Sequence, residues 1–146
     1  IVLRTTVMTG FPGEDEEDFA ALCEFIKEIR FERLGCFAFS PEEGTVAATL
    51  PDQIPQKVKD RRRDIVMETQ ARISDAYNRS RIGQTVEVLV ESFDRYAECW
   101  FGRSAADAPD IDCKVFFTTK KRVQPGDLVQ VRITDTLDWD LIGERV

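Results

Sequence analysis

The stretch IVLRTTVMTGFPGE, residues 1–14, decides the fold of the first half of the chain. Aliphatic and β-branched residues dominate its first nine positions, which is typical of a buried strand. Gly10 and Gly13 bracket Phe11 and Pro12, and such a turn lets the backbone pass close to a neighbour. Asp15 then stands at a helix N-cap, followed by acidic residues that a helix N-terminus favours. The stretch predicts a βα unit whose turn lies at the strand's carboxyl end, where parallel α/β folds place their chemistry.

Two further segments extend this unit. Apolar residues recur every three or four positions between Glu16 and Arg30, which predicts an amphipathic helix. The apolar run from Leu34 to Phe39 predicts a second buried strand, because parallel strands tend to be apolar throughout. The loop at 40–45 follows that strand directly. Two strands are therefore expected to deliver two loops to the same edge of the sheet.

A long helix is expected after a turn-rich connector at 47–54. Pro55 suits the first position of that helix, and Gly83 is expected to end it. Its apolar positions are Val58, Ile65, Val66, Ile73, Ala76 and Tyr77. Its first half also carries a basic stripe made of Lys57, Lys59, Arg61, Arg62 and Arg63. A charge run on a helix usually forms a solvated face, and we expect that here.

From residue 84 onward the pattern changes to short segments of alternating hydrophobicity. They are 85–90, 96–101, 115–118, 128–133 and a closing stretch at 140–143. Short strands at this spacing, separated by turn signals, predict a small closed β-barrel. The fold class is thus α/β plus all-β, with a division expected near residues 81–83.

Charge and composition limit the function classes. The 146 residues are 42% hydrophobic and 32% charged, which describes a globular chain rather than a disordered one. The net charge is −7, and residues 83–146 hold eight Lys and Arg against twelve Asp and Glu. Nucleic-acid binders usually carry a basic surface, so this balance argues against such a partner. A basic protein would complement it better.

Cysteine and histidine usage narrows the chemistry. The four cysteines, Cys23, Cys36, Cys99 and Cys113, form no CxxC pair, so we expect reduced thiols in a cytoplasmic protein. A disulfide between Cys99 and Cys113 across a hairpin is the alternative. Histidine is absent, which removes imidazole from catalysis and from metal binding. The chain opens on Ile1 inside a strand, so we expect a fragment of a longer protein.

Four segments together carry a family resemblance. In order they read LRTTVMTGFPGE, FERLGCFAFSPEEGTVAATLPDQIP, GRSAADAPDID and DWDLIG. This ordered set resembles the methylthiotransferases of the radical S-adenosylmethionine superfamily, in particular the branch that modifies an aspartate of small-subunit ribosomal protein twelve. The resemblance implies that residues 1–82 are the last two βα units of a partial TIM-like radical barrel. It also implies that residues 83–146 are a TRAM domain, a small five-stranded antiparallel barrel similar to an OB-fold.

The resemblance also implies cofactors and their site. S-adenosyl-L-methionine would lie against the first strand and its turn, held by Arg4, Thr6, Gly10, Phe11, Pro12 and Gly13. Arg4 would pair with the cofactor's carboxylate, or alternatively form a salt bridge that closes the barrel. The family carries two [4Fe-4S] clusters, whose cysteine motifs are missing here. Catalysis therefore belongs to the parent protein, and this chain alone is expected to be inactive.

The substrate class rests on the loop at 40–45. Glu42 stands where the tRNA-modifying branch of the family has an arginine, and an acidic side chain would repel phosphate and attract a basic ribosomal protein. The expected substrate-binding residues are Glu42, Glu43, Trp100 and Trp139. Each glutamate is alternatively a solvated loop residue, and each tryptophan a core residue. Alternative functions are a tRNA methylthiotransferase fragment and a TRAM binding module without chemistry.

Overall fold

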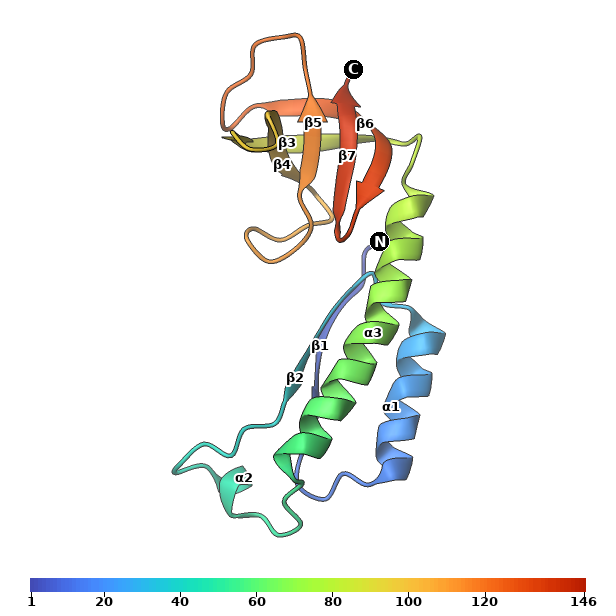
Figure 1. Ribbon diagram of the computed structural model, residues 1–146, viewed down its shortest axis with the longest axis vertical. Helices are drawn as coiled ribbons and strands as arrows, with labels where there is room; N and C mark the ends of the chain where they lie inside the picture. The colour runs from blue at the N-terminus through green and yellow to red at the C-terminus, as the bar shows by residue number, and fades with distance from the viewer. The chain divides into compact units, whose positions relative to one another are not determined.

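The computed structural model describes residues 1–146 and divides into two compact units, Ile1–Ile73 and Ser74–Val146 (Figure 1). We call them the first and the second unit. The long helix α3 (Gln56–Ser80) crosses the division, so its last turns belong to the second unit. None of the helices is both long and apolar enough to cross a bilayer.

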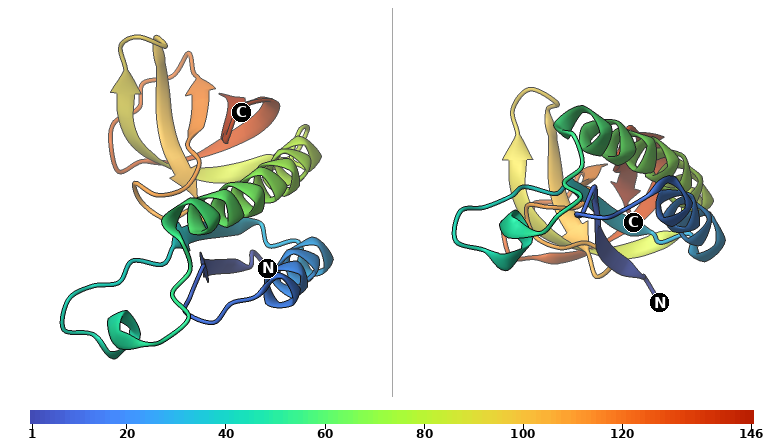
Figure 2. Two further views of the ribbon diagram at one scale, coloured as in Figure 1. Left: turned by 60° about the horizontal axis from the view of Figure 1, so that its bottom comes forward. Right: turned by 90° about the horizontal axis from the view of Figure 1, so that it is seen from below.

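The first unit is a two-stranded parallel sheet covered on one face by helices. Its elements are β1 (Arg4–Thr9), α1 (Glu16–Ile29), β2 (Arg33–Ala38), the short α2 (Val46–Thr49) and most of α3. Its core is a cluster of buried side chains from α1, β2 and α3, namely Phe19, Ile26, Leu34, Cys36, Val66 and Ile73. Val7 of β1 packs against that cluster. Figures 1 and 2 show α1 and α3 side by side along the same sheet.

Helix α1 begins where the sequence predicts it. The Asp15 side chain accepts a hydrogen bond from the backbone N–H of Asp18 at 2.8 Å, and the Asp18 side chain accepts one from the Asp15 N–H at 3.3 Å. This reciprocal capping box satisfies amides that the first helical turn leaves without partners. The acidic residues in the first turn of α1 are thus explained by local helix chemistry.

The turn-rich connector predicted at 47–54 overlaps a short helix that the sequence pattern did not predict. The four residues of α2 form one helical turn there, because the Thr45 hydroxyl accepts a hydrogen bond from the Ala48 N–H at 3.3 Å. A threonine before a short alanine-containing run is a standard N-cap. The connector otherwise keeps its turn character.

The second unit is a closed barrel of five strands. They are β3 (Thr85–Asp94), β4 (Cys99–Ser104), β5 (Val115–Thr118), β6 (Leu128–Leu137) and β7 (Asp140–Arg145), in the order β3-β4-β5-β7-β6. The predicted five-stranded barrel is confirmed. The expectation that it is wholly antiparallel is wrong, because β5 and β7 pair in parallel. Strand directions cannot alternate all the way round a closed ring with an odd number of members, so one pair must be parallel.

The barrel interior is filled by apolar side chains, most of them from β3, β5, β6 and β7, and Trp100 of β4 packs against them. The buried cluster consists of Val88, Val90, Val115, Phe117, Val123, Val129, Val131, Ile133 and Leu141. At Gly102 on β4 the neighbouring strand comes so close that an added Cβ would lie 2.0 Å from the Leu89 carbonyl oxygen. Only glycine fits there. The expected strand at 96–101 begins later, at Cys99, because the Asp94 carboxylate accepts from the Tyr96 and Ala97 amides and holds them in a turn.

The last turns of α3 are built into the second unit. The Asn78 side-chain amide donates to the Trp139 carbonyl at 3.0 Å, and the Gly83 N–H donates to the Ile133 carbonyl at 2.8 Å. These bonds join the helix end to the β6–β7 hairpin. The four cysteines are free, and the Cys113 thiol donates to the buried Asp107 carboxylate rather than bonding to Cys99.

Candidate ligand site at the carboxyl ends of β1 and β2

The turn after β1 is held in a tight backbone conformation. Gly10 and Gly13 have φ angles of +74° and +87°, in the left-handed region that favours glycine. The Glu14 N–H donates to the Phe11 carbonyl at 2.9 Å, and the Gly10 N–H donates to the Glu14 carboxylate at 3.0 Å. The Gly13 N–H donates to the Asp52 carbonyl of the connector. The turn is therefore closed on itself and tied to the following segment.

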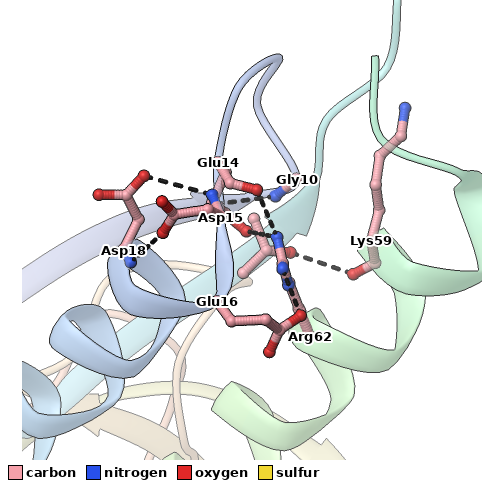
Figure 3. Close-up of polar contacts among 8 residues, drawn as sticks. Gly10, Glu14, Asp15, Glu16, Asp18, Lys59 and Arg62 are labelled. Carbon is pink, nitrogen blue, oxygen red and sulfur yellow. Dashed lines mark hydrogen bonds and ion pairs between the residues drawn. The ribbon is translucent and has the colours of Figure 1, made fainter. Parts of the chain in front are cut away.

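Arg62 of α3 fixes this turn to the start of α1 (Figure 3). Its guanidinium donates to the Glu14 carboxylate at 2.7 Å, to the Glu14 carbonyl at 3.0 Å and to the Glu16 carboxylate at 2.7 Å. Burial alone would lower the pKa of Arg62, but the hydrogen bonds that it donates to Glu16 and Glu14 outweigh this effect and raise that pKa. The guanidinium also lies over the Phe19 ring, 5.3 Å from its centroid. Arg62 is a permanently charged, buried cross-link.

Lys59, one turn earlier on α3, lies against the ends of both strands. Its backbone carbonyl accepts from the Thr9 hydroxyl at 3.2 Å, and its ammonium donates to the Phe39 carbonyl at 3.1 Å. Its stem crosses Gly10, where an added Cβ would lie 2.2 Å from the Lys59 Cγ. Glycine is thus needed at position 10 for two reasons: the positive φ of this residue and the Lys59 side chain packed against it.

Aromatic rings complete the site. Phe11 of the turn and Phe39, which follows β2, meet edge to face with their ring centroids 5.3 Å apart. The Phe39 ring is buried and lies 5.0 Å from the Lys59 ammonium, whereas Phe11 is 45% exposed. The two strand ends therefore present an accessible aromatic ring, a glycine turn and a cation in one place. That set suits a ligand that combines a flat ring with an anionic group.

The interpretation of the basic stripe as a solvated face is wrong for two of its residues. Lys59 and Arg62 are buried, although Lys57 and Arg61 are exposed as expected. The signal was present in the spacing, because positions 59 and 62 fall on the helical face of positions 66, 70 and 73, which are buried. A pattern of apolar residues does not reveal this buried face, because basic residues occupy two of its positions.

The expected cofactor residues do not all lie together. Arg4 and Thr6 lie on the sheet face opposite the helices, as do the exposed side chains of Met8 and Phe37. Gly10, Phe11, Pro12 and Gly13 form the turn at the strand's far end. A strand rises about 3.3 Å per residue, so Arg4 and the turn are separated by roughly the length of β1.

The expected substrate residues fall in both units. Glu42 and Glu43 are exposed in the loop after β2, with the Ser40 hydroxyl donating to the Glu42 carboxylate at 2.7 Å. Trp100 on β4 packs against the barrel core and meets the Phe93 ring at 5.4 Å, an arrangement typical of a core residue. Trp139 lies in the β6–β7 turn and is 47% exposed.

A metal site is not among the features of this chain. No group of three or more His, Cys, Asp or Glu residues lies close enough together to hold a metal ion.

The barrel defines the class of the second unit. Residues 82–146, which contain all five strands of the barrel, match the TRAM domain family. The whole chain is 48% identical over 147 residues to the ribosomal protein uS12 methylthiotransferase RimO of Geotalea uraniireducens, covering 100% of this chain and 33% of that protein. It is 48% identical over 144 residues to RimO of Caldanaerobacter subterraneus, covering 99% and 33%. With RimO of Salmonella arizonae the identity is 44% over 146 residues, covering 100% and 33%.

The chain spans about a third of the length of these curated relatives. Its sequence corresponds, in both units, to the C-terminal third of the RimO methylthiotransferases and ends in their TRAM domain.

Proposed function

We propose that this chain is the C-terminal part of a radical S-adenosylmethionine enzyme that methylthiolates an aspartate of ribosomal protein uS12. The observation that carries the proposal is the similarity over the whole chain, at 44–48% identity, to proteins bearing that name. In this proposal residues 1–82 are the end of the radical domain and residues 83–146 the TRAM domain. The parent is the enzyme, and this part contributes binding.

The turn after β1 fits one end of S-adenosyl-L-methionine. The exposed Phe11 ring offers a surface for the adenine, and nothing lies within 4 Å of a Cβ built on Gly13, so a ligand has room to approach that backbone. Thr6 and Arg4 continue the same strand on the face away from the helices. When bound, this cofactor supplies the carbon radical that removes hydrogen from the substrate. The two [4Fe-4S] clusters belong to residues outside this chain.

The docking of a basic protein is supported by charge and exposure. Glu42 and Glu43 are solvent-exposed in the loop beside the strand ends, and residues 83–146 carry a net charge of −4. Complementary charge speeds the encounter of two proteins and favours one partner over another. Trp139, half-exposed in the β6–β7 turn, offers an apolar anchor of the kind that dominates interfaces.

A tRNA substrate is the second candidate, and one observation favours it. The barrel has the strand order of an OB-type fold, whose first and last hairpin loops often bind oligonucleotides. Here these loops carry the fully exposed Tyr96 and the half-exposed Trp139, both able to stack on bases. The acidic balance of the barrel opposes this candidate.

The test uses the full-length protein that contains this chain. Purified uS12 and tRNA are each offered with the cofactor and reductant, and mass spectrometry looks for the methylthio group on either. Binding is measured across a salt series with the variant E42R/E43R and with E28R, which reverses a charge on α1. We expect the double variant to weaken uS12 binding about tenfold at low salt and E28R to change it little. Modified tRNA, with a steep salt slope, would replace the proposed substrate.

A further inference from the structure

The Lys59 ammonium is a buried cation with too few acceptors. An ammonium has three N–H donors, and Phe39 accepts one of them through its carbonyl oxygen. Lys59 is only 3% exposed and forms no ion pair with any carboxylate of the chain. Arg62, one turn away, has two carboxylates and a carbonyl. Burying an ammonium without a counter-charge is costly, so a purely structural role is poorly explained.

The position of this cation is fixed by the fold. Its backbone is held by the Thr9 hydroxyl, and its stem fills the space above Gly10. Figure 3 shows the side chain extending away from Arg62 and the glutamates around it. Its ammonium reaches the residue that follows β2, at the edge of the sheet where α/β folds bind their ligands. A methionine would fill the same space without a buried charge, so the charge itself calls for a reason.

We propose that the Lys59 ammonium binds a carboxylate of the ligand at the carboxyl ends of β1 and β2. The proposal rests on the proposed function, which supplies two sources of that group. One is the amino-acid end of S-adenosylmethionine, and the other is the side chain of the aspartate that is modified. Arg4 lies at the opposite end of β1. Arg4 and Lys59 are therefore too far apart to bind the same carboxylate.

The experiment compares K59M with wild type in the full-length holoenzyme, using K57M on the exposed face of α3 as the matched control. For the cofactor source, calorimetry measures the affinity for S-adenosylmethionine and for its decarboxylated analogue. For the substrate source, binding is measured for a uS12 peptide with the aspartate and for the same peptide with alanine in its place. A charge-assisted hydrogen bond predicts that K59M loses about tenfold or more for one carboxylate-bearing ligand. Its affinity for the matching ligand without the carboxylate should stay within about twofold of wild type.

The arms separate the possible outcomes. Loss for the cofactor alone assigns Lys59 to the cofactor's carboxylate, and loss for the aspartate peptide alone assigns it to the substrate. If K59M binds all four ligands as wild type does, Lys59 is only a cap on β2 and the proposal is overturned. K59R, which keeps the charge, should retain binding if K59M unfolds. If the wild-type protein binds neither ligand, the proposed function and this inference are both overturned. If only K59M loses binding, the proposed function stands.

Discussion

Replacing Arg62 with methionine is expected to destabilise the first unit by about 3 kcal/mol or more. The side chains of Arg62 and Glu14 are 6% and 13% exposed, and their charged atoms are 2.7 Å apart. Removing one partner of a buried ion pair leaves the other charge without compensation, which costs about 3–5 kcal/mol. Glu14 keeps its bond from the Gly10 N–H, which places the expected value near the lower end. Contact with the Phe19 ring adds about 0.5–1 kcal/mol.

The second carboxylate provides the matched control. Glu16 bonds to the same guanidinium at the same distance, but its side chain is 85% exposed. An exposed partner of an ion pair contributes about 0–1 kcal/mol, so E16Q should be nearly neutral. The double variant E14Q/R62M should be more stable than R62M alone, because it leaves no buried charge.

The two units can be followed separately in one urea titration. Both tryptophans, Trp100 and Trp139, lie in the second unit, whereas α1 and most of α3 lie in the first. Far-UV circular dichroism therefore reports mainly on the first unit and tryptophan fluorescence on the second. R62M should lower the midpoint of the dichroism transition and leave the fluorescence transition in place. A loss below about 1 kcal/mol, or strictly additive effects of E14Q and R62M, would refute the buried-pair argument.

Three further predictions concern single positions. G102A should destabilise the barrel by several kcal/mol in urea titrations followed by tryptophan fluorescence, because the added Cβ would lie 2.0 Å from the Leu89 carbonyl oxygen. G126A is the control: Gly126 has a φ of +95° but open space around an added Cβ, so this variant should cost only about 1–2 kcal/mol. Burial raises the pKa of Asp140, so its protonated carboxyl stabilises the fold below the unfolded pKa of about 3.9, and this contribution is lost as pH rises through the folded pKa. D140N should therefore raise the melting temperature at pH ~7, and this gain should vanish below pH ~4. A gain that persists in acid would contradict the raised pKa of Asp140. Burial raises the pKa of Cys36 to about 11, so roughly one Cys36 thiol in a thousand is ionised at pH ~8. Iodoacetamide should therefore label Cys36 only after unfolding. Rapid labelling of Cys36 in the folded chain would contradict this.

The local elements were accessible from the sequence because their causes are local. The Asp15 cap and the apolar spacing after it predicted α1, and both depend on contacts within one or two helical turns. The alternating segments after residue 84 predicted the five strands of the barrel for the same reason. The parallel pairing of β5 and β7 was not predicted: an odd number of strands in a closed ring requires a parallel pair, but which strands form it depends on the fold.

The sequence predicted the turn at residues 10–13, but the part of the candidate site that α3 contributes was decided only by tertiary structure. Whether Lys59 and Arg62 face solvent or the turn after β1 depends on which face of α3 packs against the sheet. The positive charge of a side chain does not indicate which face that is. The buried Arg62 became recognisable only once Glu14, 48 residues away in sequence, came within hydrogen-bonding distance. Trp100 and Trp139 are chemically identical, yet one packs on the barrel core and the other lies half-exposed in a turn. Burial and pairing between distant segments depend on packing. The sequence pattern therefore determined the helices and strands, whereas the environment of their side chains was determined only by the tertiary structure.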